Sequence, residues 1–342
     1  MSEEIVVTFF KIHKCGFYRS GKKIFGSLED LLPDLKKWAE AVQLMTETNL
    51  LGGETEDASG NEYRDIFYYD YCEANKNSLL VLWNRLPDIL GSVPTLSVNR
   101  KTGDNTQCEI TNLPKNSIPG TASYYWFLPE KNCFATIARK NKTSNVKGMK
   151  LYLQTFLATR SQHCSYEKKD DGNEIKGYIE PKKQKILTDV TPYFQASRAT
   201  RKGQLEFITS NRTKIRKIIR KQKVTKELKS RQNIGRKLLI AMGLKNPKVE
   251  NKEFNTSYEV AYTPTELELK ELISEWEDSN ATDYDDTGFV LIRDSKTHWL
   301  SGEISRIKKD WEVKYKDAEI LEPQELLKLL NTYKDELLAV LK

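Results

Sequence analysis

Hydrophobic positions along this 342-residue chain fall mostly into short runs that are rich in β-branched and aromatic residues. Such runs, bounded by turn-forming residues, predict β-strands. In the first 200 residues the predicted strands are 5–13, 66–72, 79–83, 124–128, 133–138, 175–179 and 193–199. The turn sequence Pro-Glu-Lys-Asn at 129–132 makes 124–128 and 133–138 the clearest hairpin. Four consecutive aromatic residues, 124–127, must then point to both faces of the sheet.

Other segments carry apolar residues at helical spacing. A helix is predicted from Ser27, a suitable N-cap, to about Met45, and a second at 147–159. Residues 264–277 predict an acidic helix. Residues 323–341 predict a closing amphipathic helix, whose many leucines suit a protein core or a dimer interface.

Strands are also predicted at 258–262, 289–292, 298–300 and 304–315, the last three as a small antiparallel sheet. Together the elements predict an α+β fold of mixed antiparallel sheets with packed helices, a central basic helical segment and a closing amphipathic helix. We expect three domains. These are an N-terminal α+β domain (1–165), a basic and largely helical nucleic-acid-binding segment (166–250) and an acidic C-terminal α+β domain (251–342).

Composition places the chain among soluble globular proteins, with 38% hydrophobic and 30% charged residues. No apolar run approaches the 18 or so residues of a membrane-spanning helix. The first residues lack the order of regions that marks a signal peptide. We therefore expect a cytoplasmic protein.

Positive charge is concentrated in residues 212–237, where twelve Lys or Arg stand against the single acid Glu227, a net charge of +11. The whole chain carries only +7, so the remainder sums to −4. Between Arg198 and Lys248 the net charge is +15. A local basic stripe is typical of proteins that bind a polyanion.

The stretch from Arg212 to Val224 fits an anchored helix. At helical spacing, Ile215, Ile218 and Ile219 share one narrow arc and cations cover the rest. Three interpretations remain open: a solvated charged face, a membrane-surface helix, and a surface that binds nucleic-acid phosphates. We favour the last, because acidic i,i+4 partners that would relieve self-repulsion are nearly absent and the apolar side lacks Trp, Phe and Leu.

The predicted nucleic-acid-binding residues share a position in this stretch. They are Arg212, Lys214, Arg216, Lys217, Arg220, Lys221 and Lys223, with Arg231, Arg236 and Lys237 extending the path. The sequence predicts that the helix continues from 224 to 243. A helix-turn-helix near Val224 is a further alternative, but the sequence fixes neither the turn nor a recognition helix. A Lys and Arg stripe of this kind grips phosphates and carries little sequence information.

Catalytic and metal-binding signals are sparse. The five cysteines lack C-x-x-C spacing and read as reduced structural thiols, and three histidines make a His-based zinc site improbable. Arg293 and His298 have an R-x4-H spacing but lie in a sequence of strand-turn-strand character. Asp283, Asp285 and Asp286 have the composition of a solvated turn, or of a Mg²⁺ site. We expect no catalytic residue, metal or cofactor.

Three features of the layout are shared with a known family. They are an N-terminal strand with Gly16-Phe17-Tyr18 before a leucine-rich helix, a central hairpin with Phe127 and Phe134 before the helix containing Leu153, Phe156 and Leu157, and the segment IRDSKTHWLSGEIS before the last helix. In these the chain resembles the RexA-like phage exclusion (abortive infection) proteins. The resemblance spans most of the length without an invariant motif, and the basic stretch here is denser. It implies a dimeric sensor that binds DNA with little sequence preference and signals to a membrane partner, and it carries over no catalytic residue.

The sequence thus predicts a non-enzymatic DNA-binding protein of phage defence or exclusion, acting on double-stranded DNA as a homodimer, with a membrane or effector protein as a further partner. Two alternatives stay open. One is a metal-dependent nuclease that uses the basic stripe to position its substrate. The other is a protein-docking module whose basic face binds the acidic part of another copy, since residues 250–342 carry a net charge of −10.

Overall fold

The computed structural model describes residues 2–51, 65–86, 92–97, 109–112, 117–140, 142, 144–169, 172–199, 204–224, 254–278, 286–294, 296–300, 305–317 and 319–341. The chain divides into two compact units. Unit 1 comprises Met1–Ala199 and Ser305–Lys342, and unit 2 comprises Thr200–Ile304. This division does not coincide with the three domains expected from composition, because the end of the chain returns to the unit formed by its beginning.

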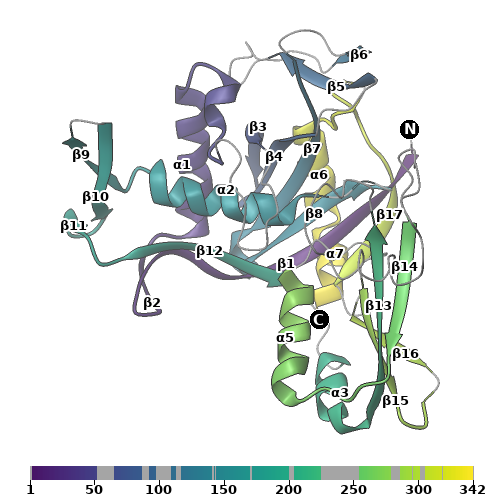
Figure 1. Ribbon diagram of the computed structural model, residues 1–342. Helices are drawn as coiled ribbons and strands as arrows, with labels where there is room; N and C mark the ends of the chain where they lie inside the picture. Colours follow the sequence, from purple (N-terminus) through teal and green to yellow (C-terminus); the bar gives the residue numbers. More distant parts are fainter. Residues whose placement is uncertain are drawn as a thin grey trace, which may run out of the picture. The chain divides into compact units, whose positions relative to one another are not determined.

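Unit 1 is built on a ten-stranded antiparallel sheet around β1 (Ser2–Arg19) (Figure 1). The main path of the sheet is β12 (Thr191–Arg198), β1, β8 (Cys133–Arg139), β7 (Ser117–Leu128), β4 (Asn77–Arg85) and β3 (Ile66–Ala74). Off this path, β2 (Lys22–Phe25) and β17 (Arg306–Glu312) pair with β1, and β5 (Ser92–Ser97) pairs with β7 and β6 (Glu109–Asn112). A separate small sheet contains β9 (Cys164–Lys169), β10 (Gly172–Glu180) and β11 (Lys185–Leu187).

The hairpins of this sheet follow from their turn residues. The predicted hairpin at 124–138 is confirmed as β7 and β8, and its turn ends at Asn132, whose φ of 47° lies in the left-handed region. Asn75 and Lys76 between β3 and β4 both have positive φ, as a two-residue type I′ turn requires. The type and length of these two turns fix the register of the strands that they join.

Helices cover both faces of the large sheet. α1 (Leu28–Ala41) and α2 (Val146–Thr159) pack on one face, and α6 (Pro323–Thr332) and α7 (Lys334–Leu338) on the other. The predicted cap of α1 is confirmed, because Ser27 Oγ accepts a hydrogen bond from the Asp30 amide at 3.2 Å. Asn145 caps α2 in the same way through the Gly148 amide. The fold is therefore of the α+β class.

The consecutive aromatics of β7 divide between the two faces as predicted. Tyr125 and Phe127 are buried with α1 and α2, whereas Tyr124 and Trp126 are buried with α6. The predicted closing helix breaks at Tyr333 into α6, α7 and a 3₁₀ turn (Ala339–Leu341). Its leucines, among them Leu326 and Leu337, pack in the core of unit 1.

One predicted pairing is wrong. The strand expected at 304–315 does not join 289–292 and 298–300, because as β17 it pairs with β1, with Arg306 opposite Thr8. β12 pairs with the same edge of β1, with Arg198 opposite Phe10. The Ser305 amide donates to the Ala199 carbonyl at 2.8 Å. Unit 2 is therefore an insertion between two residues that are hydrogen-bonded neighbours in unit 1.

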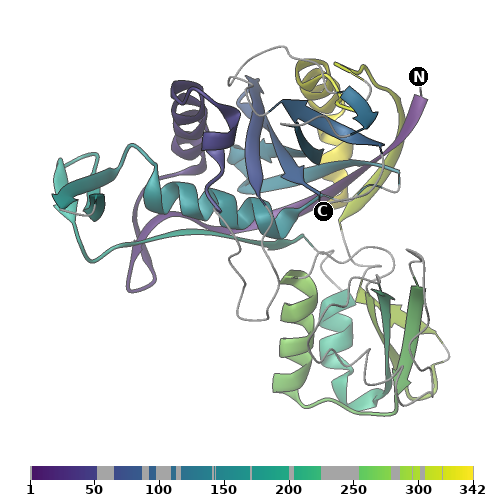
Figure 2. The same ribbon diagram turned by 45° about the horizontal axis from the view of Figure 1, so that its top comes forward.

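Unit 2 has a four-stranded antiparallel sheet in the order β14 (Phe254–Val260), β13 (Ile215–Val224), β15 (Asp286–Leu291) and β16 (Thr297–Trp299). α3 (Gln204–Ser210) and α5 (Glu266–Asp278) cover one face of it (Figure 2). They enclose a small core that contains Ile208, Leu269 and Phe289. The predicted acidic helix and the strand near Tyr258 are confirmed here.

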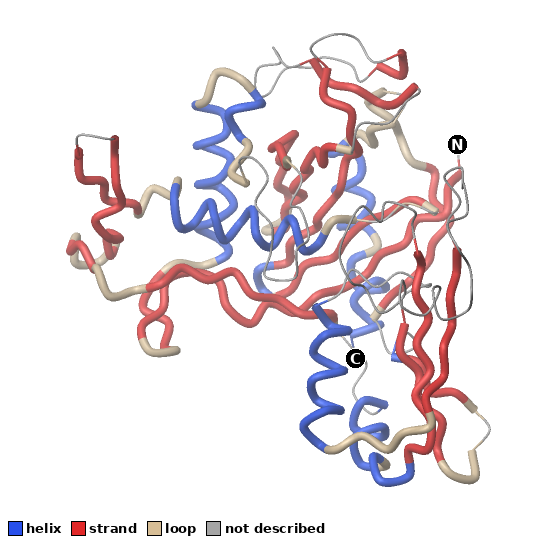
Figure 3. Tube along the Cα trace, in the orientation of Figure 1, coloured by secondary structure: helices blue, strands red, loops and turns tan. Residues whose placement is uncertain are grey.

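The predicted helix at Arg212–Val224 is wrong. Arg212–Lys214 form a single 3₁₀ turn and Ile215–Val224 form β13, an inner strand of the sheet (Figure 3). As a helix, Arg212, Arg216 and Arg220 would repel one another at i,i+4 spacing. As a strand, the same stretch gains partners on β14 and β15, and its three isoleucines favour extended backbone. The continuation predicted at 224–243 lies almost wholly outside the described residues.

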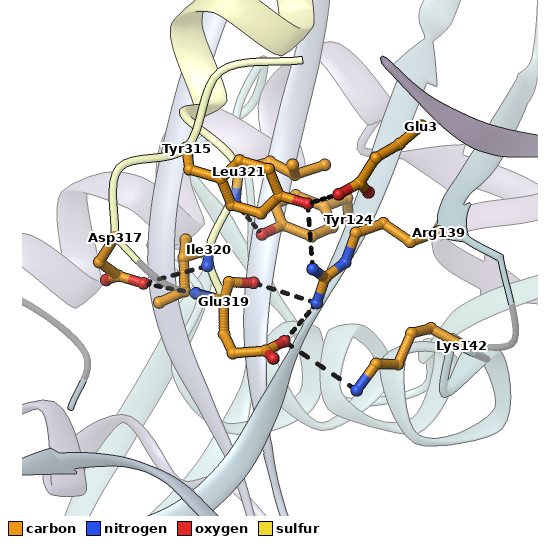
Figure 4. Close-up of polar contacts among 9 residues, drawn as sticks. All are labelled: Glu3, Tyr124, Arg139, Lys142, Tyr315, Asp317, Glu319, Ile320 and Leu321. Atoms are coloured by element: carbon orange, nitrogen blue, oxygen red, sulfur yellow. Dashed lines mark hydrogen bonds and ion pairs between the residues drawn. The ribbon is translucent and has the colours of Figure 1, made fainter. Parts of the chain in front are cut away.

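A network of hydrogen bonds and an ion pair joins residues 315–321, between β17 and α6, to the sheet of unit 1 (Figure 4). The Arg139 guanidinium on β8 pairs with the Glu319 carboxylate and donates to Tyr315 Oη at 3.1 Å. Tyr315 in turn donates to the Glu3 carboxylate on β1. The neighbouring Leu321 amide donates to Tyr124 Oη at 2.8 Å. Because the Arg139 side chain is only 19% exposed, its loss would leave Glu319 partly buried without its main partner.

We expect Arg139→Met to lower the free energy of unfolding by about 1.5–3 kcal/mol, the range for hydrogen bonds to charged groups. Lys142→Met is the matched control. It removes one positive charge near the same carboxylate, but its Nζ lies 4.0 Å from Glu319 and its side chain is 51% exposed. This control should cost less than about 1 kcal/mol. Urea unfolding followed by tryptophan fluorescence checks both variants, and equal losses would contradict the role given to Arg139.

Candidate nucleic-acid interface

The predicted basic residues that the structure describes lie on β13 and on the 3₁₀ turn before it. Side chains of a strand alternate between the faces of its sheet. Ile218 packs with the core under α3 and α5, so Arg220 lies on the helix-covered face as well. Lys217, Ile219 and Lys221 lie on the opposite face. The three isoleucines therefore do not share one side, in contrast to the helical expectation.

Two of the cations pair with acids of unit 2. Lys217 Nζ pairs with Glu259 on β14, and Arg220 Nη1 lies 3.9 Å from Glu275 Oε2 on α5. Both pairs join the basic strand to the acidic half of the same unit. These two charges are thus partly neutralised within the protein. In the protein-docking alternative, another copy was expected to supply the acids, whereas here Glu259 on β14 and Glu275 on α5 of the same unit supply them.

Three other cations have neutral partners. Arg212 Nη1 donates to the Pro264 carbonyl at 2.8 Å, and Arg216 Nε donates to the Leu291 carbonyl at 3.2 Å. Lys221 Nζ lies 3.8 Å from the centre of the Trp299 ring. None of the three forms an ion pair with an acid in the part of the chain that the structure describes. Neutral partners fix the position of these side chains. Arg212 also acts on an acid, because the pKa of Glu266 is lowered mainly by Lys270 and further by the charge of Arg212.

Arg216 owes its position to a bulge. The register between β13 and β15 shifts between Ile215 and Lys217, so Arg216 is the extra residue of β13 at this point. Its side chain is exposed. Lys214 is also exposed, and its Nζ donates to Asn211 Oδ1 at 3.0 Å. The structure therefore brings Arg212, Lys214 and Arg216 together at the start of the strand.

The remaining predicted residues cannot be placed in this surface. Lys223 belongs to β13, but its side chain is not described, and Arg231, Arg236 and Lys237 lie outside the described residues. Trp299 is a contact residue that the sequence alone does not single out. The only indication in the sequence is that a tryptophan follows His298 in a short predicted strand. Tryptophans in such strands are more often core residues than contact residues.

The other candidate sites have structural roles. His298 is 8% exposed, its Nε2 lies 2.8 Å from Asp294 Oδ2, and its ring contacts Phe207 on α3. Arg293 is exposed in the turn between β15 and β16 with a φ of 63°. This confirms the strand-turn-strand character of the segment. The Arg293 and His298 pair therefore has neither the helical setting nor the shared exposure of a catalytic pair.

Asp286, one member of the predicted acidic cluster, is a buried residue of β15 rather than part of a solvated turn. Its Oδ1 accepts a hydrogen bond from the Thr287 amide at 2.8 Å. Asp283 and Asp285 lie outside the described residues. Across the described ranges, no three His, Cys, Asp or Glu side chains gather as a metal site would require.

Comparisons with known proteins add no neighbour. No family model matches the chain, and no curated protein or solved structure matches it. Among the helices that the structure describes, none combines the length and the apolar character needed to cross a membrane.

The environment of the described cysteines favours the thiol over the thiolate. Cys15, Cys72, Cys133 and Cys164 are free thiols that are buried or half-buried. Burial raises the pKa of Cys15 and Cys72 to about 12 and that of Cys133 to about 11. Burial also raises the pKa of Cys164. The thiolate, which is the reactive form, is therefore scarce at neutral pH.

We expect these four thiols to resist Ellman's reagent at pH 8, because on the order of 10⁻³ or less of Cys15, Cys72 and Cys133 is then ionised. Cys108→Ser is the suitable background, since it removes the one cysteine outside the described residues. Four thiols should react in urea and none in the folded protein within the same time. Fast reaction of a thiol in folded Cys108→Ser would reopen a nucleophilic or metal-binding role.

Proposed function

We propose that the chain binds DNA with little sequence preference, through phosphate contacts of the basic residues of unit 2, and acts in phage exclusion. The observation that supports DNA binding is the pairing of Arg212, Arg216 and Lys221 with neutral groups. A cation that is fixed by a carbonyl or an aromatic ring keeps its charge for a polyanion. Less conformational entropy is then lost when a phosphate binds.

The secondary structure of the basic stretch supports the absence of sequence preference. The major groove of B-DNA admits an α-helix or a two-stranded ribbon. β13 has β14 on one side and β15 on the other, so it enters no groove as a recognition element. The cations of this sheet would then contact phosphates, which position a protein without specifying bases.

Other parts of the proposal come from the resemblance to RexA-like proteins. They are the role in phage exclusion, the homodimer and the membrane or effector partner. The proposed cytoplasmic location rests instead on the composition and first residues of the sequence, and the proposed absence of catalysis on its sparse motifs. The ion pairs of Lys217 and Arg220 set a limit on the binding surface, because both cations already stabilise unit 2. We therefore assign the phosphate contacts first to Arg212, Lys214, Arg216 and Lys221.

The test is the binding of a labelled 30-mer DNA, single-stranded or duplex, as a function of salt. The logarithm of the binding constant falls by about 0.9 per phosphate neutralised on a duplex and by about 0.7 on a single strand. Removing two phosphate-binding cations in Arg216→Gln/Lys221→Gln should therefore reduce the salt slope by about 1.4 to 1.8 and weaken binding. Intact DNA after incubation with Mg²⁺ is the expected outcome for a non-enzymatic protein.

Lys182→Gln/Lys183→Gln is the matched control, because it removes the same charge from exposed positions of unit 1. Its salt slope should equal that of the native chain. Equal slopes for all three proteins, or no salt-dependent binding by the native chain, would overturn the proposal. Cleavage that depends on Mg²⁺ would replace it with the nuclease.

A further inference from the structure

Trp299 stands apart from the other tryptophans. Five of the six, at positions 38, 83, 126, 276 and 311, pack in the three hydrophobic clusters of the protein. Trp299 belongs to none of these clusters and is half-buried on β16. Its neighbour His298 faces α3, where it contacts Phe207. By strand alternation, the Trp299 indole therefore lies on the face of the sheet opposite α3 and α5.

A glycine on the next strand makes room for the indole. Gly288 of β15 lies opposite Trp299, and a Cβ at Gly288 would sit 2.8 Å from an indole carbon and 2.5 Å from Thr297 Cγ2. Any side chain there would push the ring away from the sheet. Because Gly288 has none, the indole rests on the backbone of β15 and approaches β13, which pairs with β15 on its other side.

Lys221 reaches the indole from β13. Its backbone lies in register with buried Asp286, yet its ammonium is placed over the Trp299 ring, 3.8 Å from the centre. Three strands thus contribute to one contact, with the cation from β13, the glycine floor from β15 and the ring from β16. Lys217 and Glu259 form their ion pair on the same face.

We propose that Trp299 and Lys221 form a stacking site for the bases of single-stranded DNA. An indole that is held flat on a sheet beside exposed cations matches the way in which proteins bind single strands, by stacking bases on aromatic rings and attracting the phosphates. When a base stacks on the ring, the Lys221 ammonium moves from the ring to the adjacent phosphate. This inference rests on the proposed DNA binding and narrows its ligand.

A duplex fits this site less well. Its bases are stacked on one another inside the helix and present only their edges in the grooves. A ring on the face of a sheet reaches such bases only after they are unpaired. The sheet that replaces the predicted basic helix, with an aromatic ring on one face, favours unstacked bases over the double-stranded DNA expected from the sequence.

The experiment compares a labelled single strand of 15 thymidines with a labelled 30-mer duplex, using the full chain. We expect the native protein to bind the single strand more tightly. Trp299→Ala should weaken single-strand binding roughly 5- to 150-fold, the loss of one stacked base. It should weaken duplex binding much less, because a duplex loses only the ring that positions Lys221. Trp299→Phe is the conservative variant, and it should retain most of the single-strand affinity because it keeps an aromatic face.

Tryptophan fluorescence gives a second readout that does not depend on the alanine variant folding. The emission of Trp299 is obtained as the difference between the spectra of the native protein and Trp299→Phe. The thymidine strand should quench this emission, and the duplex should leave it unaffected. Equal effects of Trp299→Ala on both DNAs, or no quenching of Trp299, would overturn the stacking site. Salt-dependent binding that survives this outcome leaves the proposed function standing, whereas no binding of either DNA removes both.

Discussion

The long strand β1 is the element on which the rest of the chain depends. One of its edges pairs with β8, and the other is shared end to end by β12 and β17. The adjoining ends of those two strands meet at Ala199 and Ser305, whose backbones are hydrogen-bonded to each other. All of unit 2 is inserted at this junction without breaking the ladder of unit 1. Because unit 2 has its own core around Phe289 and Leu269, the insertion needs no packing from the large sheet to form its own sheet.

Elements with local signals could be predicted from the sequence. The hairpin of β7 and β8 carries its turn residues between its strands, and α1 carries Ser27 at its start, so neighbouring residues decide both. The place of β17 could not be predicted in this way. Its partner Thr8 lies at the opposite end of the chain, and nothing near Arg306 distinguishes β1 from β15 as a neighbour. Pairing between distant strands is decided by the whole sheet rather than by the strand itself.

The basic stretch shows how tertiary context can override a local pattern. Isoleucines at 215, 218 and 219 fit a helical stripe, and they also fit a strand with a bulge after Ile215. The strands that pair with this stretch, β14 and β15, lie later in the chain, as do Glu259 and Glu275, which pair with its cations. Positive charge was therefore visible in the sequence, whereas its geometry and the contact with Trp299 were not. A strand in place of the expected helix also bears on whether a single strand or a duplex would bind to its cations.

Partner chemistry separates the cations of β13 into two groups. Lys217 and Arg220 face carboxylates on β14 and α5, and these contacts hold the sheet and helix together. Arg216 instead donates to the Leu291 carbonyl of β15, and the Lys221 ammonium lies over the Trp299 indole of β16. A neutral partner does not cancel the charge of a cation as a carboxylate does. Lys221 thus lies on the face of the sheet where Trp299 lies. In the stacking site that we propose, Lys221 would contact the phosphate and Trp299 the base of one nucleotide.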